Sequence, residues 1–274
     1  MRASLIQIGV DPDETVEARR VRAASLVREQ STADLVVLPE LWTVGAFAID
    51  SFAAEAEPLH GPGARTVRAM SAAARDARVW LHAGSVIERA ERAERAEDSG
   101  DSGGTALYNT SLVFSPGGDL VRTYRKIHRF GFDRGEATLL SAGTEQVTVP
   151  LPDTTLGLAT CYDLRFPELF RALVQQGART LVVPAGWPAR RAGHWTLLAR
   201  ARAVENQCHV LACGTAGTHA GVPQAGRSAI IDPWGETLAE AEGAEECVVT
   251  ADLDPAYVTR VRRDFPVLRD RVLR

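Results

Sequence analysis

The order of apolar segments is the feature that most limits how this chain of 274 residues can fold. Short apolar or alternating runs, typical of β-strands, are interspersed with longer segments in which apolar residues recur at helical spacing. Some neighbouring strand-like runs have no helical segment between them, for example Val79–Glu88 and Ala106–Phe114. This order predicts an α/β fold of two mixed sheets that are covered by helices on the outside.

The predicted elements run from the N-terminus almost to the C-terminus without a linker or an internal repeat between them. Strands are predicted at Ser4–Val10, Leu35–Pro39, Val79–Glu88, Ala106–Phe114, Leu120–Tyr124, Leu156–Thr160, Thr180–Pro184, His209–Gly214, Ser228–Asp232 and Glu246–Ala251. Helices are predicted at Glu14–Gln30, Ala64–Ala77, Pro167–Gln176 and Gly193–Asn206. We therefore expect a single domain, residues 1–274, with a core at about 3–253 and a charged, mostly helical tail at 254–274.

Composition and charge narrow the functional classes. Apolar residues make up 45% and charged residues 24% of the chain, and the net charge is only -4, which points neither to nucleic acid nor to a membrane surface. No apolar run reaches the roughly 18 residues of a membrane span, and the N-terminus lacks the pattern of a signal peptide. None of the four cysteines stands in a CxxC pair. We expect a cytoplasmic protein without disulfides.

Lys126 is the only lysine among the 31 basic residues, and all the others are arginine. A lysine retained in so arginine-rich a sequence suggests a position where arginine will not serve. Lysine offers a compact ammonium on a flexible stem, whereas arginine carries a wide planar fork. A crowded catalytic pocket is such a position, although retention by chance on the surface would give the same count.

Two apolar strands end beside a residue with reactive chemistry. Glu40 follows Leu35–Pro39, and Cys161 follows Leu156–Thr160 directly, before the helix that begins near Pro167. Loops at strand ends are common ligand sites in α/β folds. A nucleophilic cysteine needs a base, and no histidine stands in a papain-type or caspase-type context. A buried glutamate with a raised pKa can serve instead. Taken singly, a buried structural thiol and a surface glutamate remain open as alternatives.

Three segments together resemble the signatures of the nitrilase (carbon–nitrogen hydrolase) superfamily, and they occur in the family's order. They are Leu38-Pro39-Glu40-Leu41, Tyr124-Arg125-Lys126-Ile127-His128, and Thr160-Cys161-Tyr162-Asp163-Leu164-Arg165-Phe166-Pro167-Glu168. The similarity continues through Pro184–Trp187, Arg200–Gln207 and Ile231–Glu236, so it covers nearly the whole chain. The resemblance implies a four-layer α-β-β-α sandwich, a homodimer or larger homo-oligomer, and no metal or organic cofactor.

The resemblance also implies a role for each residue of the site. Glu40 would act as general base, Cys161 as nucleophile, and Lys126 together with the backbone N–H of Tyr162 as stabilisers of the oxyanion. The family carries a second glutamate after the lysine segment, and Glu136 matches it best here. That glutamate would orient Lys126 and the substrate.

Three stretches, Cys161–Phe166, Ala199–Gln207 and Asp264–Val267, most resemble the omega-amidase (Nit-type) branch. Members of that branch hydrolyse amides of small dicarboxylic acids or deaminated glutathione. Such small-molecule amides carry a carboxylate, and Arg165 could bind it by a two-point contact. Phe130, Tyr162 and Trp187 would form the walls of the pocket. The alternatives are that Arg165 pairs with Glu168 as part of the scaffold, and that the aromatic rings are plain core packing.

The loop Arg129–Glu136 is shorter than the corresponding loop expected in that branch, which leaves the substrate open. An N-carbamoyl amidohydrolase would use the same residues and release carbon dioxide as well as ammonia. Cys161-Tyr162-Asp163 resembles the amidase branches rather than the nitrile-hydrolysing branch, where Trp and Glu commonly follow the cysteine. Two further alternatives are a catalytically silent binding protein on the same fold and a papain-like protease that depends on a histidine.

Overall fold

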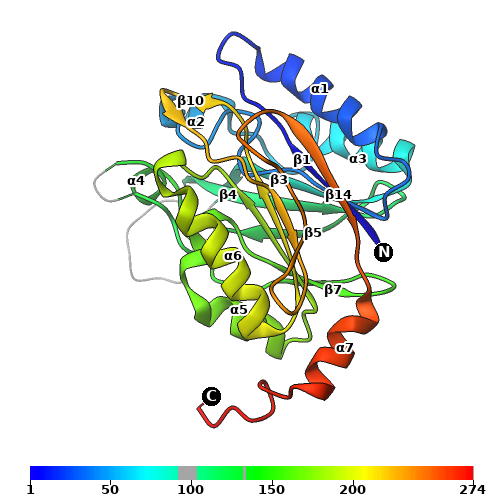
Figure 1. Ribbon diagram of the computed structural model, residues 1–274. Helices are drawn as coiled ribbons and strands as arrows, with labels where there is room; N and C mark the ends of the chain where they lie inside the picture. The colour runs from blue at the N-terminus through cyan, green and yellow to red at the C-terminus, as the bar shows by residue number, and fades with distance from the viewer. Residues whose placement is uncertain (92–103, 132–133, 274) are drawn as a thin grey trace.

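The computed structural model describes residues 1–91, 104–131 and 134–273, and its strands form two stacked sheets of six (Figure 1). The first sheet contains β1 (Arg2–Gln7), β2 (Leu35–Val37), β3 (Trp80–Glu91), β4 (Thr105–Phe114), β5 (Leu120–Arg125) and β14 (Cys247–Asp252), in the order β14-β1-β2-β3-β4-β5. The second contains β6 (Thr148–Pro150), β7 (Thr155–Leu158), β8 (Thr180–Ala185), β9 (His209–Gly214), β12 (Ala229–Ile231) and β13 (Thr237–Glu240), in the order β13-β12-β9-β8-β7-β6. A small hairpin joins β10 (Thr218–His219) to β11 (Val222–Pro223).

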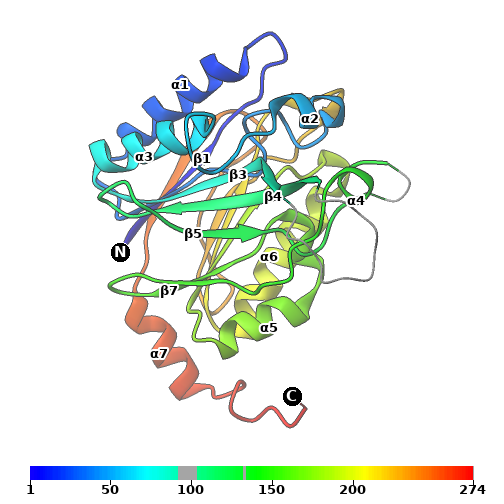
Figure 2. The ribbon, with the colours of Figure 1, turned by 180° about the vertical axis from the view of Figure 1, so that it is seen from behind.

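Helices cover the outer face of each sheet. The α-helices are α1 (Val16–Arg28), α2 (Phe52–Glu55), α3 (Arg65–Ala77), α4 (Glu136–Leu139), α5 (Pro167–Gln175), α6 (Ala192–Asn206) and α7 (Pro255–Asp264), and 3-10 turns lie at Ile49–Ser51, Cys161–Arg165 and Ala189–Arg191. The pair α1 and α3 packs on the first sheet, and α5 and α6 pack on the second (Figures 1 and 2). The predicted four-layer α-β-β-α arrangement of two mixed sheets is therefore confirmed.

The apolar runs are continuous because both faces of the central strands are buried. In β2 and the residue after it, Val36 and Leu38 pack toward α1 and α3, whereas Leu35 and Val37 pack toward the second sheet. The same alternation places Val182 of β8 between the sheets. Successive side chains of a strand point to opposite faces, so a strand inside a four-layer fold needs apolar residues at every position.

Every predicted strand and helix is present, with bounds that differ by a few residues. The strands and α-helices that were not predicted, such as β6, β13, α2 and α4, have four residues or fewer, too few to show a period. The tail is less helical than expected, because α7 ends at Asp264. Pro266 disfavours helical geometry in the residue before it, so the helix cannot continue past Phe265.

The topology brings several strand ends to one region. β2 and β3 are parallel, and β5 runs in the same direction because β4 pairs antiparallel with both β3 and β5. In the second sheet, β7 and β8 are parallel. The two sheets are joined beside these ends by a hydrogen bond of 3.0 Å between the hydroxyls of Ser111 and Thr160. The residues that follow β2, β5, β7 and β8 therefore meet between the sheets.

Candidate active site

Glu40 stands in a sharp turn just beyond β2. The next residue, Leu41, has a left-handed φ of 46°, and its N–H donates to Ser85 Oγ at 3.1 Å. The turn presses against Gly84, which has a φ of 64° and whose missing Cβ would lie 1.9 Å from the Pro39 carbonyl oxygen. Only glycine fits there, so a residue of β3 fixes the turn that presents Glu40.

Glu40 is only 1% exposed, and its carboxylate accepts three hydrogen bonds. Its Oε1 accepts from Lys126 Nζ at 2.7 Å and from Asn109 Nδ2 at 2.8 Å. Its Oε2 accepts from the backbone N–H of Gly186, just after β8, at 2.8 Å. A side chain from the first sheet is thus anchored to the backbone of the second, which restricts it to one orientation.

Lys126 follows β5 directly, is 2% exposed, and lies between two glutamates. Its Nζ donates to Glu40 Oε1 at 2.7 Å and to Glu136 Oε2 at 2.6 Å. Burial alone lowers the pKa of a lysine, but the charges of Glu136 and Glu40 outweigh it and hold the Lys126 pKa well above its ordinary value. The ammonium is therefore kept charged in the interior.

Asn109, in β4, completes a ring of four side chains. Its Nδ2 donates to Glu40 Oε1 at 2.8 Å and to Glu136 Oε1 at 2.6 Å. Burial raises the pKa of Glu136 and the charge of Lys126 opposes the rise, and the net pKa lies above the ordinary value. Asn109 was not predicted from the sequence, because one polar residue in an alternating strand carries no signal of its own. Its complete burial is visible only in the fold.

Cys161 begins a 3-10 turn right after the β7 segment and is 7% exposed. Its φ of 48° is left-handed, a strained geometry for a residue with a Cβ. Its Sγ lies 3.8 Å from the carbonyl oxygen of Gly186. Burial raises the pKa of the thiol well above its ordinary value, the charge of Glu40 raises it further, and Lys126 opposes the rise. The resting sulfur therefore carries its proton.

Asp163 joins the lysine segment to the cysteine turn. This fully buried carboxylate accepts from the Tyr124 hydroxyl at 2.7 Å and from the Thr160 N–H at 2.9 Å through Oδ2. Its Oδ1 accepts from the His128 N–H at 3.0 Å and lies 2.7 Å from His128 Nδ1. Residues on either side of Lys126 and the residue before Cys161 thus share one anchor, which fixes the lysine relative to the thiol.

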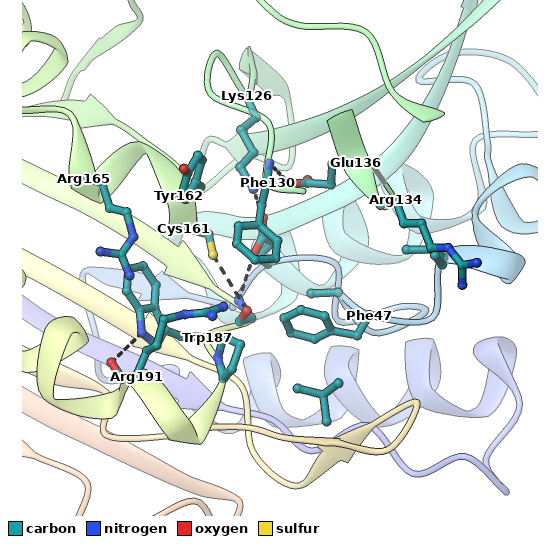
Figure 3. A pocket seen from close by; sticks show the side chains of 17 residues that line it. Phe47, Lys126, Phe130, Arg134, Glu136, Cys161, Tyr162, Arg165, Trp187 and Arg191 are labelled. Atoms are coloured by element: carbon teal, nitrogen blue, oxygen red, sulfur yellow. Dashed lines mark hydrogen bonds and ion pairs between the residues drawn. The ribbon is translucent and has the colours of Figure 1, made fainter. Parts of the chain in front are cut away.

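These groups lie at one side of a cavity of about 210 Å³ (Figure 3). It is lined by Glu40, Ala46, Phe47, Ile49, Lys126, Phe130, Arg134, Gly135, Glu136, Cys161, Tyr162, Arg165, Gly186, Trp187, Pro188, Arg191 and Val222. All eight residues that the sequence singled out are therefore in one place. The cavity is smaller than the roughly 300–1,000 Å³ of pockets for drug-sized ligands, so it suits a small molecule.

The aromatic and basic residues predicted for the pocket wall do line this cavity. Phe130 meets Tyr162 edge-on with ring centroids 5.3 Å apart. The Arg165 guanidinium lies over the Trp187 ring at 4.9 Å and within 3.3 Å of His194 Nδ1. Within the part of the chain that the structure describes, Arg165 makes no ion pair, with Glu168 or with any other carboxylate. The scaffold alternative for Arg165 is therefore not what the structure shows.

The cavity lacks the groups that two other chemistries would need. No histidine is among its described lining residues, so the base of a papain-like protease is missing there. Nor does any group of three or more His, Cys, Asp or Glu side chains among the described residues have the geometry to hold a metal ion. No helix among the same residues has the length and apolar character needed to cross a membrane.

Comparison with known proteins agrees with the fold. The family model described as "Carbon-nitrogen hydrolase" matches residues 2–263. The 2-oxoglutaramate amidase of Paenarthrobacter nicotinovorans is 42% identical over 97% of this chain and 87% of its own length. Omega-amidase NIT2 of Homo sapiens is 35% identical over 98% and 94%. The crystal structure of Saccharomyces cerevisiae Nit3, a member of branch 10 of the nitrilase superfamily, superposes with a TM-score of 0.84 at 31% identity, covering 100% of this chain and 97% of Nit3.

The fold and the buried cluster of glutamate, lysine and cysteine define a class, and the matches agree with it: the chain belongs to the carbon-nitrogen hydrolase family of the nitrilase superfamily. Within that superfamily it is an enzyme of the omega-amidase-like kind, as its similarity to omega-amidases along nearly all of its length indicates.

Proposed function

We propose that this enzyme hydrolyses the C–N bond of a small, carboxylate-bearing linear amide through a cysteine thioester and releases ammonia. The observation that carries the proposal is the closed ring of Glu40, Lys126, Glu136 and Asn109 beside the Cys161 thiol, at one side of a cavity of about 210 Å³. It supplies a base, a fixed cation and a nucleophile within one small space.

The first step is the attack of sulfur on the amide carbon. The thiol is protonated at rest, so Glu40, the carboxylate beside it at the cavity, takes the proton as the S–C bond forms. The carbonyl oxygen then gains a negative charge. The Lys126 ammonium and the backbone N–H of Tyr162 stabilise that charge, since the first N–H groups of a helical turn have no acceptor within the turn.

The second step expels ammonia. The proton held by Glu40 passes to the nitrogen as the C–N bond breaks, and the tetrahedral intermediate collapses to a thioester on Cys161. Glu40 then takes a proton from water, which attacks the thioester carbon, and the acid is released while the thiol regains its proton. Glu136 and Asn109 do not react in this scheme. They hold Lys126 and Glu40 in place through both steps.

The carboxylate end of the substrate is assigned to Arg165, which lies at the cavity without an ion-pair partner among the described residues. A guanidinium can bind a carboxylate by two parallel hydrogen bonds. The names of the similar proteins, 2-oxoglutaramate amidase and omega-amidase, support an amide of this kind. Phe130 and Trp187 would enclose the chain between the two ends.

The test is ammonia release from a panel of short omega-amides, N-carbamoyl amines and simple aliphatic amides, with Cys161→Ala as the inactive control. We expect release from a carboxylated omega-amide, none from the control, and an acyl adduct on Cys161 in the wild-type protein by mass spectrometry. Release of ammonia and carbon dioxide from N-carbamoyl compounds alone would contradict the substrate class. If the protein releases ammonia from none of these compounds, a catalytically silent binding protein is favoured.

We also propose that the enzyme works in the cytoplasm as a homodimer or larger homo-oligomer, as its resemblance to the superfamily implies. Exposed apolar side chains support self-association: Leu197 and Val204 on the outer side of α6, and Trp234 in contact with Phe265. Light scattering on the purified protein tests the oligomer. A monomer at micromolar concentration would contradict it.

A further inference from the structure

Arg191 is a second guanidinium at the cavity, on the same side as Arg165. In Figure 3 the two arginines lie near Trp187 and Cys161, whereas Arg134 lies apart from them, beyond Phe47. Arg191 ends the 3-10 turn Ala189–Arg191. The sequence does not single it out, because an arginine in an arginine-rich chain resembles an ordinary surface charge.

The backbone of Arg191 is held firmly. Its N–H donates to the Pro188 carbonyl at 2.9 Å, and its carbonyl accepts from Trp187 Nε1 at 2.8 Å. The side chain reaches over the Phe130 ring, with the guanidinium carbon 5.1 Å from the centroid. Trp187 therefore contacts both arginines, since Arg165 lies over its ring. Each guanidinium group therefore lies over an aromatic ring, Trp187 for Arg165 and Phe130 for Arg191, rather than against a carboxylate.

The charges of the cavity are unbalanced at this side. The only acidic residues among its described lining are Glu40 and Glu136, and both accept hydrogen bonds from Lys126. Neither Arg165 nor Arg191 makes an ion pair within the described residues. Burial, and then repulsion from Arg190 and Arg165, lowers the pKa of Arg191, so the nearby cations already disfavour its charge. Two positive charges held close together without an acidic protein partner create a positive potential that attracts an anionic ligand.

We propose that Arg191 is a specificity-determining residue that acts with Arg165 as a two-guanidinium site for the carboxylate end of the substrate. This rests on the proposed function, because the site matters only if a carboxylated amide is bound. The pair offers donors on two sides of the anion and can also reach an oxygen on the adjacent carbon. The preferred substrates are then omega-amides of short dicarboxylic acids, with or without a 2-oxo group.

The same pair disfavours an ammonium on that carbon. A 2-amino substrate such as free glutamine would place its ammonium beside two guanidinium groups with no described lining carboxylate left to receive it. Repulsion between like charges in a partly buried site costs affinity. Arg191 therefore both attracts the carboxylate and discriminates against the amino acid.

The test compares Arg191→Gln with Arg190→Gln. Arg190 is the neighbouring arginine, which is exposed and does not line the cavity, so it controls for a general loss of positive charge. Steady-state constants are measured for three omega-amides of equal length, 2-oxo, unsubstituted and 2-amino, and for an aliphatic amide that lacks the carboxylate. Loss of one charge-assisted contact predicts a KM for the carboxylated amides that is about 10- to 150-fold higher in Arg191→Gln, with kcat changed little.

Three further outcomes are expected: the KM of the aliphatic amide is unchanged, Arg190→Gln behaves like the wild type, and the preference for 2-oxo over 2-amino substrates shrinks in Arg191→Gln. If Arg191→Gln loses activity equally on carboxylated and uncharged amides, the role of Arg191 is structural. That result would overturn this inference but leave the proposed function standing. So would a wild-type KM in Arg191→Gln. A wild-type enzyme that hydrolyses no carboxylated amide would overturn the proposed function, and the inference with it.

Discussion

Lys126→Met is the substitution that most directly tests the buried charge cluster. Methionine keeps much of the side chain's length but cannot donate to Glu40 or Glu136, which now lie 2.7 and 2.6 Å from Nζ. Removing one partner from a buried ion pair typically costs about 3–5 kcal/mol, because the other charge is left without compensation. In a chain of this size, 1 kcal/mol corresponds to roughly 2–4 °C in Tm. We therefore expect Tm at pH 8 to fall by about 6–20 °C.

The fall in Tm caused by Lys126→Met depends on pH, and the protonation of Glu136 decides the direction of that dependence. Burial already raises the pKa of Glu136, and in the variant the opposing charge of Lys126 is gone, so the pKa rises further. A carboxyl whose folded pKa is raised contributes stability fully below its unfolded pKa, about 4.3, and loses it as pH rises through the folded pKa. The Tm difference between wild type and Lys126→Met should therefore be smaller at pH 5 than at pH 8.

Thermal unfolding at both pH values, with ammonia release measured in parallel, tests this reasoning. Activity should fall by at least about 100- to 1000-fold, the usual effect of losing an oxyanion donor. Lys126→Arg is the matched control: it keeps the charge but not the compact ammonium, so it should lose activity with a smaller loss of Tm. A Lys126→Met protein as stable as wild type at pH 8, with the same pH dependence, would refute the account of the cluster.

Three further substitutions probe how the site is held. Asn109→Leu removes the hydrogen bonds that Asn109 donates to Glu40 and Glu136, and the bond to Glu136 lowers the pKa of that glutamate. We expect kcat/KM to fall about 10-fold or more. The acid limb of the pH profile should move to higher pH, because Glu136 then binds its proton more readily. In Asp163→Asn a single side-chain oxygen remains to accept the hydrogen bonds that the two carboxylate oxygens of Asp163 now accept. This variant should have a lower Tm in unfolding assays and a lower kcat in turnover assays. Gly84→Ala forces a Cβ against the Pro39 carbonyl and should lower Tm by several degrees and reduce kcat.

For Gly84→Ala the control is Gly61→Ala, where φ is 78° but no atom lies within 4 Å of the added Cβ, so the difference isolates the clash. Asn109→Leu that retains the wild-type pH profile would show that the amide is only a spacer. If Asp163→Asn changes Tm but leaves kcat untouched, the carboxylate stabilises the fold without positioning Lys126 relative to the thiol.

The layers of the fold and the reactive residues of the site follow from the amino-acid sequence by itself. The continuous apolar runs predicted strands that are buried on both faces, and the missing helices between some of them predicted two mixed sheets. The lone Lys126, and the positions of Glu40 and Cys161 at strand ends, selected three of the residues that lie together at the cavity. These signals are local, because periodicity and the chemistry of single residues survive in the sequence.

What only the tertiary structure decided is which side chains meet. Asn109 lies in the middle of a strand, and it reaches two carboxylates because β4 and the loops after β2 and β5 converge there. Arg191 differs from the exposed Arg190 beside it only because a short turn directs one of them to the cavity. Such pairings depend on the stacking and register of two sheets, which bring together residues far apart in the chain, and no local pattern encodes that geometry.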